Sequence, residues 1–227
     1  MAKRAVIVGA SRGIGLGLTG ELLARGWHVR ASQRSHSEGL AALAQAHGDA
    51  LEIVTADVVE ESSYANLSAG LAEGSVDAVL VNAGIMPDPA KTFLEVTPDE
   101  IAHAMMTNTF GPARVAVHML PFVTPGGTCG LTSSIVASIE LSRGGYDLYR
   151  VTKVSLNMLA RAIWAQHVPE KDKAILSVHP GYVRTEMGGP GASISVEESQ
   201  TGLANVLEAE HAPGHRSITW EGGELPW

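Results

Sequence analysis

Short apolar runs alternate with amphipathic stretches along the whole chain of 227 residues. The runs are rich in β-branched residues and almost continuously apolar, which is typical of strands buried on both faces of a parallel sheet. The stretches between them repeat apolar residues every three or four positions, which predicts helices. The predicted strands are Ala5–Gly9, His28–Ser32, Leu51–Thr55, Ala78–Val81, Gly127–Thr132, Ala174–His179 and Ser217–Trp220. The predicted helices are Gly15–Arg25, Gly39–Ala46, Ser63–Leu71, Ile101–Leu120 and Leu148–Gln166.

Strands that alternate with helices need right-handed crossovers, which build a parallel sheet covered on both faces. We therefore predict an α/β fold with a doubly wound sheet of about seven strands. The sequences from Thr97 to Glu100 and from Ser195 to Glu198 are capping boxes, which mark two helix starts. No linker is long or polar enough to divide the chain, so residues 1–227 are predicted to form a single domain.

Residues 6–15 read Val-Ile-Val-Gly-Ala-Ser-Arg-Gly-Ile-Gly, an apolar strand that enters a glycine-rich turn and then a helix. This arrangement presents backbone N–H groups to the pyrophosphate of a dinucleotide. Gly9 and Gly13 allow a tight turn and close approach to the phosphates, and Gly15 allows close packing of helix on strand. The spacing differs from the commoner G-x-G-x-x-G, so a purely structural strand–helix turn is the alternative.

Tyr149 and Lys153 are four residues apart in a predicted helix, so they share one face. An ammonium close to a phenol favours the phenolate and lowers the phenol pKa by about 1–3 units from about 10. Lys153 also has protons to donate to ribose hydroxyls. The alternative is an interfacial tyrosine beside a lysine whose aliphatic stem packs on the surface.

Ser133 and Ser134 follow the predicted strand Gly127–Thr132 at its carboxyl end, where open α/β sheets bind ligands. A serine hydroxyl at this place can hold a substrate carbonyl oxygen beside the tyrosine. Alternatively, the two serines only begin a turn.

Five motifs occur in one order along the chain: Gly9-x-x-x-Gly13-Ile14-Gly15, Asn82-Ala83-Gly84, Ser134, Tyr149-x-x-x-Lys153 and Pro180-Gly181. Over essentially the whole chain this order resembles the short-chain dehydrogenase/reductase family. The stretch 218–227 resembles that of the C-factor and sniffer-like carbonyl-reductase branch. The resemblance implies a Rossmann fold and hydride transfer between a nicotinamide cofactor and a small carbonyl or alcohol substrate.

The resemblance also implies roles for single residues. Tyr149 is similar to the general acid of the family, Lys153 to its pKa modulator and ribose anchor, and Ser134 to the group that orients the carbonyl. Asn108 resembles the helix asparagine that holds a water in the proton relay. The implied cofactor-binding residues are Gly9, Ser11, Arg12, Gly13, Ile14, Gly15, Arg34, Asp57, Val58, Asn82, Ala83, Gly84, Tyr149, Lys153, Pro180, Gly181, Val183 and Thr185.

The chain departs from the family pattern at two places. Val8 stands where the family usually has threonine, so a hydrogen bond that stabilises the glycine turn is missing or replaced. The spacing from Ser134 to Tyr149 is a couple of residues longer than usual, which leaves Ser133, Ser134 and Ser138 as candidates, with Ser134 preferred. Tyr146 is a rival aromatic residue, but it has no lysine four positions later.

The second predicted strand ends in Ala31-Ser32-Gln33-Arg34, with no carboxylate to hold the ribose 2′-hydroxyl of NAD. Arg12 and Arg34 are placed to reach a 2′-phosphate, which a guanidinium binds in bidentate fashion. Each arginine alone is also an ordinary surface charge. Together with the missing acid they favour NADP over NAD, whereas strand alternation turns Arg30 away from the cofactor.

Composition excludes several other function classes. The net charge of −8 argues against a nucleic-acid surface, and no apolar run is long enough to span a membrane. Cys129 is the single cysteine and is predicted to be a buried strand residue, so neither a disulfide framework nor a thiolate metal cluster is expected. The histidines show no metal-ligand spacing. The apolar stretch near Val6 is too short for a signal peptide, which favours a cytoplasmic location.

Some properties follow only from the resemblance or stay open. The family pairs through helices that correspond to Ile101–Leu120 and Leu148–Gln166, which implies a homodimer or homotetramer. The short, glycine-rich stretch Glu186–Ile194 corresponds to the substrate lid and suggests a broad range of carbonyl substrates. A dinucleotide-sensing regulatory or signalling protein is the alternative function, and a sugar-nucleotide epimerase or dehydratase is a rival within the fold.

Overall fold

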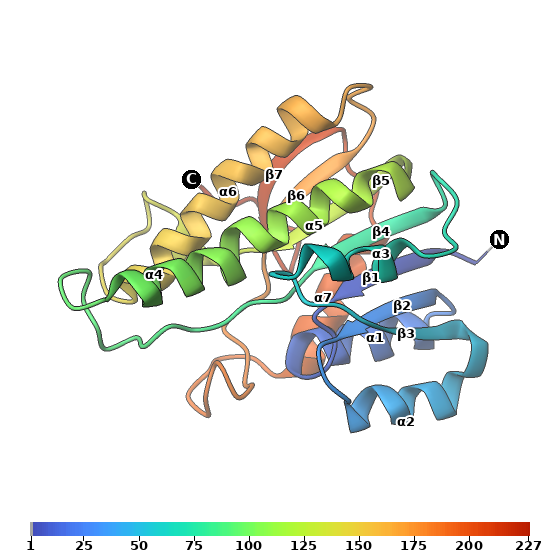
Figure 1. Ribbon diagram of the computed structural model, residues 1–227, viewed down its shortest axis with the longest axis horizontal. Coiled ribbons are helices and arrows are strands. Elements are labelled where there is room, and N and C mark those ends of the chain that lie inside the picture. Colours follow the sequence, from blue (N-terminus) through green and yellow to red (C-terminus); the bar gives the residue numbers. More distant parts are fainter. Residues whose placement is uncertain (1) are drawn as a thin grey trace.

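The computed structural model describes residues 2–227, and its seven strands form one parallel sheet (Figure 1). Their order is β3-β2-β1-β4-β5-β6-β7. The strands are β1 (Arg4–Val8), β2 (His28–Gln33), β3 (Leu51–Thr55), β4 (Val76–Val81), β5 (Val123–Thr132), β6 (Ala174–His179) and β7 (Gly214–Thr219). The predicted doubly wound α/β fold is confirmed. Because the strand order reverses between β1 and β4, their carboxyl ends form the switch point at which such sheets bind ligands.

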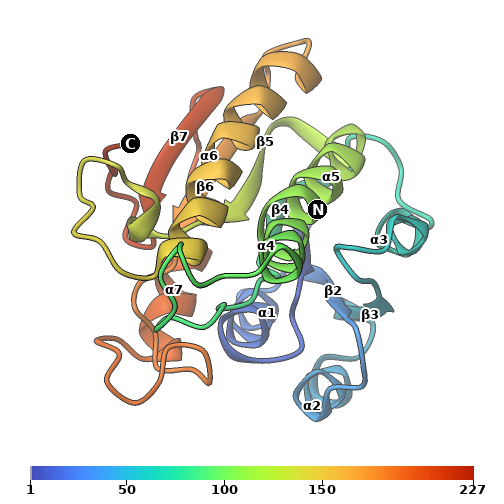
Figure 2. The same ribbon diagram turned by 60° about the vertical axis from the view of Figure 1, so that its left-hand side comes forward.

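Helices cover both faces of the sheet (Figure 2). The helices are α1 (Gly13–Ala24), α2 (Glu38–His47), α3 (Ala65–Ser68), α4 (Pro98–Met105), α5 (Gly111–Met119), α6 (Asp147–His167) and α7 (Val196–Glu208). One apolar core joins the sheet to α1, α2 and α7, and the other joins it to α3, α5 and α6. Both predicted capping boxes are present, at Thr97 before α4 and at Ser195 before α7.

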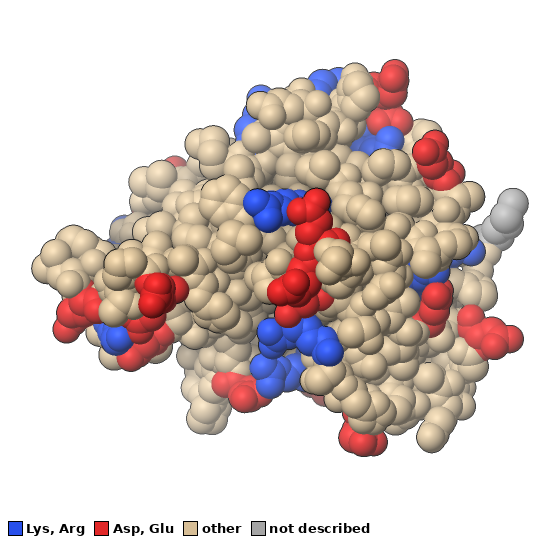
Figure 3. Space-filling view, in the orientation of Figure 1, with Lys and Arg blue, Asp and Glu red and all other residues tan. Residues whose placement is uncertain are grey.

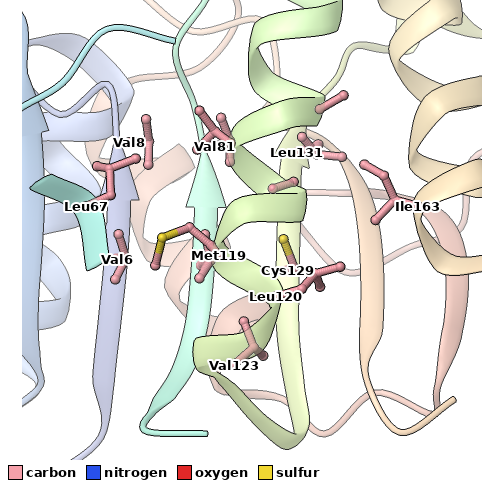
Figure 4. Packing of buried hydrophobic residues seen from close by; sticks show 14 of the residues in the cluster. Val6, Val8, Leu67, Val81, Met119, Leu120, Val123, Cys129, Leu131 and Ile163 are labelled. Atoms are coloured by element: carbon pink, nitrogen blue, oxygen red, sulfur yellow. The ribbon is translucent and has the colours of Figure 1, made fainter. Parts of the chain in front are cut away.

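The core beneath α5 and α6 is built from alternate side chains of the central strands (Figure 4). Val6 and Val81 of β1 and β4 lie on the same side of the sheet as Met119 of α5 and Ile163 of α6. Cys129 of β5 is fully buried among them, and burial raises the pKa of its thiol to about 12. The prediction that this cysteine is a buried strand residue is confirmed.

The predicted helix Ile101–Leu120 is interrupted by a π-helical turn at Met106–Phe110 before α5 begins. Pro112 has no N–H to donate, and a side chain at Gly111 would collide with the main-chain oxygen of Val58. The wider turn keeps the two halves joined while α5 approaches that segment closely.

The predicted helix Ser63–Leu71 shrinks to the single turn α3. The Ser63 hydroxyl accepts from the N–H of Asp57 and donates to its carbonyl oxygen, which ties the start of this stretch to the end of β3. Gly70, with φ +70°, ends it. The strands β5 and β7 also begin earlier than predicted. Val123 pairs with Val76 ahead of a bulge in β5, and the glycine and polar residues 214–216 pair with β6. Within residues 2–227, no helix is long and apolar enough to cross a membrane.

Candidate active site

The side chain of Asn82 ties together the carboxyl ends of β1, β4 and β5. Its amide nitrogen donates to the carbonyl of Gly9 (3.1 Å), and its amide oxygen accepts from the Thr132 hydroxyl (3.2 Å). The main-chain oxygen of Val8 accepts from the N–H groups of Asn82 and Ala83, at 2.8 and 3.1 Å. The sheet edge is thereby held together at the switch point.

The turn after β1 requires glycine because other segments of the backbone approach it closely. Gly9 has φ +85°, and a Cβ there would lie 2.7 Å from the backbone nitrogen of Ala83. A Cβ on Gly15 would collide with the carbonyl oxygen of Gly9. Gly13 also has a positive φ, of 54°. The strand, the turn and the helix therefore pack at a separation that only glycine permits.

A serine of the neighbouring strand replaces the hydrogen bond expected from a threonine at position 8. The Val8 side chain lies in the apolar core (Figure 4). The Ser32 hydroxyl, from β2, accepts the N–H of Gly9 at 3.0 Å. The turn is therefore stabilised across the sheet rather than by its own preceding residue.

The N-terminus of α1 differs from those of α2, α4 and α7. Those three helices are capped by the hydroxyls of Ser37, Thr97 and Ser195. The N-cap of α1 is Arg12, which makes no side-chain capping bond, and no acidic residue lies in the first turn. Its first N–H groups and the positive end of its dipole are left for an anion. The residues present therefore fit a dinucleotide pyrophosphate.

Two further residues of the glycine turn are fixed by contacts away from this N-terminus. The carbonyl of Ser11 accepts from the Ser37 hydroxyl at 2.6 Å, which joins the turn to the start of α2. Ile14 packs against the core beneath α1. The turn is thus held on both sides.

Tyr149 lies near the start of α6, and the nearby hydroxyl of Ser134 acts to lower the pKa of its phenol. Ser134 begins the segment that follows β5, and its hydroxyl also accepts the N–H of Val136 at 3.3 Å. The rival Tyr146 caps α6 in a left-handed conformation, with φ 55°, and is 45% exposed. Of the two tyrosines, Tyr149 is the less exposed one and lies beside a candidate serine.

The other two candidate serines face away from this tyrosine. The buried hydroxyl of Ser133 donates to Oδ1 of Asn157 on α6, at 2.7 Å. The hydroxyl of Ser138 donates to the main-chain oxygen of Trp227, at 3.3 Å. Of the three serines left open by the sequence, the fold brings Ser134 to the phenol.

Lys153 is buried one turn after Tyr149, and its Nζ donates to the main-chain oxygen of Thr132 at 2.7 Å. Burial lowers the pKa of Lys153 to about 8. Burial raises the pKa of Tyr149 to about 12, although the nearby Ser134 hydroxyl acts in the opposite direction. The predicted lowering of the phenol pKa by Lys153 is therefore wrong for the protein by itself. The ammonium lies 5.6 Å from the ring centre, and burial of the hydroxyl outweighs it.

Asn108 is fully buried in the π-helical turn and clamps the backbone of Ile85 from both sides. Its Oδ1 accepts the Ile85 N–H (2.8 Å), and its Nδ2 donates to the Ile85 carbonyl (2.9 Å) and to Oγ1 of Thr152 (3.2 Å). A Cβ on Gly84 would lie 3.2 Å from this Oδ1 and 3.6 Å from Nζ of Lys153. Asn108 thus fixes the loop after β4 beside the lysine, and protein acceptors take both of its amide protons.

The two arginines that indicate NADP lie at the carboxyl ends of β1 and β2 in exposed ion pairs. Arg12 pairs with Glu186 at 2.8 Å, and Arg34 pairs with Asp57 at 3.7 Å. The arginine side chains are 74% and 65% exposed. Such pairs are weak because water and salt screen them, so a phosphate dianion can compete for both guanidinium groups.

Arg30 is turned away from this edge, as strand alternation predicts. Its buried guanidinium pairs with Glu52 at 2.7 Å and donates to the carbonyls of Leu67 and Ala69. It therefore completes hydrogen bonds at the end of α3.

Asp57 and Val58, two of the implied cofactor-binding residues, follow β3. The carboxylate of Asp57 accepts the N–H of Val59 at 3.1 Å, which fixes the turn. Val58 is buried, and its main-chain oxygen accepts from the Tyr64 hydroxyl. Asp57 keeps a second carboxylate oxygen toward Arg34, whereas the Val58 side chain is part of the core.

The loop after β6 is closed on itself. The carbonyl of Pro180 accepts from Ser199 of α7 at 2.7 Å, and Gly181 turns the chain with φ +91°. Val183 then pairs with Ile194 in a short parallel bridge. The two ends of the predicted lid are therefore tied together at its base.

The tip of this loop reaches the glycine turn. A Cβ on Gly13 would lie 3.3 Å from the Thr185 methyl, and the next residue is the Glu186 that pairs with Arg12. The start of the predicted lid Glu186–Ile194 thus lies beside the N-terminus of α1.

A sequence model described as short chain dehydrogenase matches residues 3–193 of the chain. The chain belongs to the short-chain dehydrogenase family. It has the family's ordered motifs, and the fold brings those motifs to one edge of one sheet.

Several proteins resemble this short-chain dehydrogenase over most or all of its length. A short-chain dehydrogenase/reductase from Burkholderia multivorans with bound NADP is 35% identical, covers both chains fully and has a TM-score of 0.93. A carbonyl reductase from Pseudomonas aeruginosa PAO1 in complex with NADP is 37% identical, also over the full length of both chains, with a TM-score of 0.91. C-signal of Myxococcus xanthus is 32% identical over 68% of this chain and 94% of its own. These relatives agree with the predicted C-factor and carbonyl-reductase branch.

Three hydroxyl residues that position the site of this short-chain dehydrogenase were not predicted. Ser32 accepts from the glycine turn, Thr132 supplies the acceptor of Lys153, and Thr152 bonds Asn108. Ser32 and Thr132 both end a predicted strand at the carboxyl edge. That position was the available signal, whereas the contact of Thr152 depends on how α6 crosses the π-helical turn.

Two half-buried histidines, each with a buried Nδ1 atom, predict acid lability. Burial lowers the pKa of both His179, at the end of β6, and His215, in β7, to about 4. In the unfolded chain they take up protons near pH 6.5 and in the folded protein only near pH 4. The free energy of unfolding is therefore expected to fall as the pH drops from about 6.5 to 4.

Urea unfolding at a series of pH values measures this fall. The double replacement of His179 and His215 by asparagine should flatten the pH dependence between pH 6.5 and 5, above the range where carboxylates take up protons. The exposed His36 provides the control, and its replacement by asparagine should leave the dependence unchanged. If the free energy of unfolding of the double variant fell with pH as steeply as that of the original protein, the two histidines would not cause the acid lability.

Proposed function

We propose that this short-chain dehydrogenase is an NADP-dependent carbonyl reductase or alcohol dehydrogenase. The observation that carries the proposal is the convergence of Ser134, Tyr149 and Lys153 at the carboxyl edge of the sheet, the edge at which the uncapped α1 begins. When bound, the nicotinamide supplies or accepts the hydride. Both relatives with NADP in their structures support this cofactor.

The surroundings of Ser134, Tyr149 and Lys153 favour a separate role for each of these side chains. The phenol of Tyr149, with its pKa near 12, is protonated at neutral pH, and this is the form that donates a proton to a carbonyl oxygen. Ser134 lies beside the same hydroxyl, where it can orient that oxygen. Lys153 uses one proton on Thr132 and has others for ribose hydroxyls. Asn108 keeps the loop beside Lys153 in place.

The preference for the phosphorylated dinucleotide is expected to depend on Arg12 and Arg34. Replacing both with alanine should raise the Kd of NADPH by about 10–100-fold, because two charge-assisted contacts to a phosphate are lost. The Kd of NADH should stay nearly unchanged. Calorimetric titration of each cofactor measures the difference.

Arg4 is the matched control for these arginines. It is exposed at the start of β1, at the opposite edge of the sheet, so Arg4→Ala should leave both affinities unchanged. An equal loss of affinity for NADPH and NADH in the double variant would show that the arginines do not bind the 2′-phosphate.

The alternative is a dinucleotide-sensing regulatory or signalling protein, and the relative named C-signal is the observation that favours it. NADPH oxidation, followed by absorbance with a panel of aldehydes, ketones and quinones, separates the two functions. Consumption of NADPH with at least one carbonyl supports the reductase. Tight NADPH binding without consumption by any carbonyl would favour the sensor.

The organisation of the protein completes the proposal. All seven strands belong to one sheet, which supports one dinucleotide-binding domain over residues 1–227. For the assembly, the face of α5 and α6 has a groove of about 790 Å³, and Figure 3 shows few charges over much of this face. These features support a homodimer or homotetramer through the two helices. The cytoplasmic location stays a prediction from the sequence.

A further inference from the structure

The segment of residues 220–227 folds back from β7 onto the chain that follows β5. Its antiparallel return pairs Glu224 with Ile218, and the Leu225 N–H donates to the Ser217 carbonyl at 2.8 Å. In Figure 2 the end marked C lies beside the loop between β5 and α6. The segment thus joins the edge of the sheet to the loop that begins at Ser134.

Trp227 makes the joining contacts. Its main-chain oxygen accepts the Glu140 N–H (3.1 Å) and the Ser138 hydroxyl (3.3 Å). The Ser138 hydroxyl accepts in turn from the N–H of Leu141 at 3.2 Å. The indole packs on the ring of His215 in β7, with centroids 4.8 Å apart. One residue therefore connects β7 to two positions of the loop, Ser138 and Glu140.

The loop has few other long-range anchors. The backbone bonds of residues 135–142 to one another are local, between Ser134 and Ala137, Ile135 and Ser138, and Ile139 and Ser142. Apart from Trp227, Arg150 of α6 holds it, by donating to the carbonyl of Val136 at 3.1 Å and to the hydroxyl of Ser142 at 3.4 Å. A stretch tied at so few points depends strongly on each of them.

The loop also presents apolar side chains that packing does not use. Ile135, Ile139 and Leu141 are 40%, 75% and 38% exposed. Ile135 directly follows Ser134, and Val136 is held by Arg150, the residue after Tyr149 on α6. Side chains of this kind beside a reacting phenol are suited to the apolar part of a carbonyl substrate.

We propose that Trp227 is a positioning residue that fixes the loop of residues 135–142 as an apolar rim beside Tyr149, for bulky apolar carbonyl substrates. The substrate part of this inference rests on the proposed reductase function. The anchoring part rests on the contacts of Trp227 alone.

Hydrogen exchange measured by mass spectrometry tests the anchoring in the intact protein. Trp227→Ala and Ser138→Ala should each speed exchange in residues 135–142 by about fivefold, as expected for one lost contact of about 1 kcal/mol. Trp227→Phe keeps a ring for His215 and should restore the exchange of the original protein. Met158→Ala, at an exposed position of α6, is the control and should change nothing in the loop.

Steady-state kinetics test the rim. Trp227→Ala should raise KM for 1-phenyl-1,2-propanedione about fivefold with kcat nearly constant, and should leave KM for propanal unchanged. Unchanged exchange in the loop, or an unchanged KM for the bulky ketone, would overturn the proposal. An equal rise of KM for both substrates would overturn it as well. If the original protein reduces no carbonyl, the reductase function fails and the rim with it, while the exchange result still decides the anchoring.

Discussion

Replacing Tyr149 with phenylalanine should lower kcat for carbonyl reduction by about 10²–10⁴-fold, the usual contribution of a positioned proton donor. The ring keeps its half-buried place near the start of α6, so the packing and the fold are preserved. The Kd of NADPH should stay nearly the same, since the phenol hydroxyl is one contact among many. NADPH consumption gives the rate, and a fluorescence titration gives the affinity.

Tyr146 is the matched control for this variant. It lies three residues earlier, is 45% exposed and has no lysine one turn later, so Tyr146→Phe should keep normal turnover. Normal turnover by the Tyr149 variant would end the proposed mechanism. A loss of NADPH affinity equal to the loss of rate would place Tyr149 in binding rather than in proton transfer.

Replacing Gly15 with alanine should separate α1 from β1 and damage both stability and cofactor binding. The new methyl group would collide with the carbonyl of Gly9 and lie 2.9 Å from Nδ2 of Asn82. Overpacking of this kind costs about 1–3 kcal/mol of unfolding free energy. At this chain length each kcal/mol lowers Tm by about 2–4 °C. Thermal unfolding and NADPH titration measure the two effects.

Gly20 provides the comparison within the same helix. A methyl group there would meet Leu43 at 3.4 Å, which is ordinary contact. Gly20→Ala should therefore raise the unfolding free energy by up to about 1 kcal/mol, through the higher helix propensity of alanine. If both variants behaved alike, the close approach at Gly15 would not be what fixes the turn.

The sequence by itself determined the sheet and the place of the site. Buried parallel strands are continuous apolar runs, and capping boxes are local, so β3 and β6 were predicted at their observed bounds, as were the starts at Thr97 and Ser195. The glycine turn could also be recognised from the sequence, because it is a local feature. Its conformational demands fall on the residues that make it.

Only the tertiary structure decided which groups meet. The sequence left three serines open, and the crossing of α6 over β5 turned Ser133 toward Asn157 and Ser134 toward Tyr149. The tertiary structure also reversed the expected direction of the pKa shift of Tyr149. Burial of the phenol depends on the assembled fold and not on a spacing of four residues. The contact of Trp227 with the loop after β5 spans almost ninety residues, a distance over which no local pattern carries information.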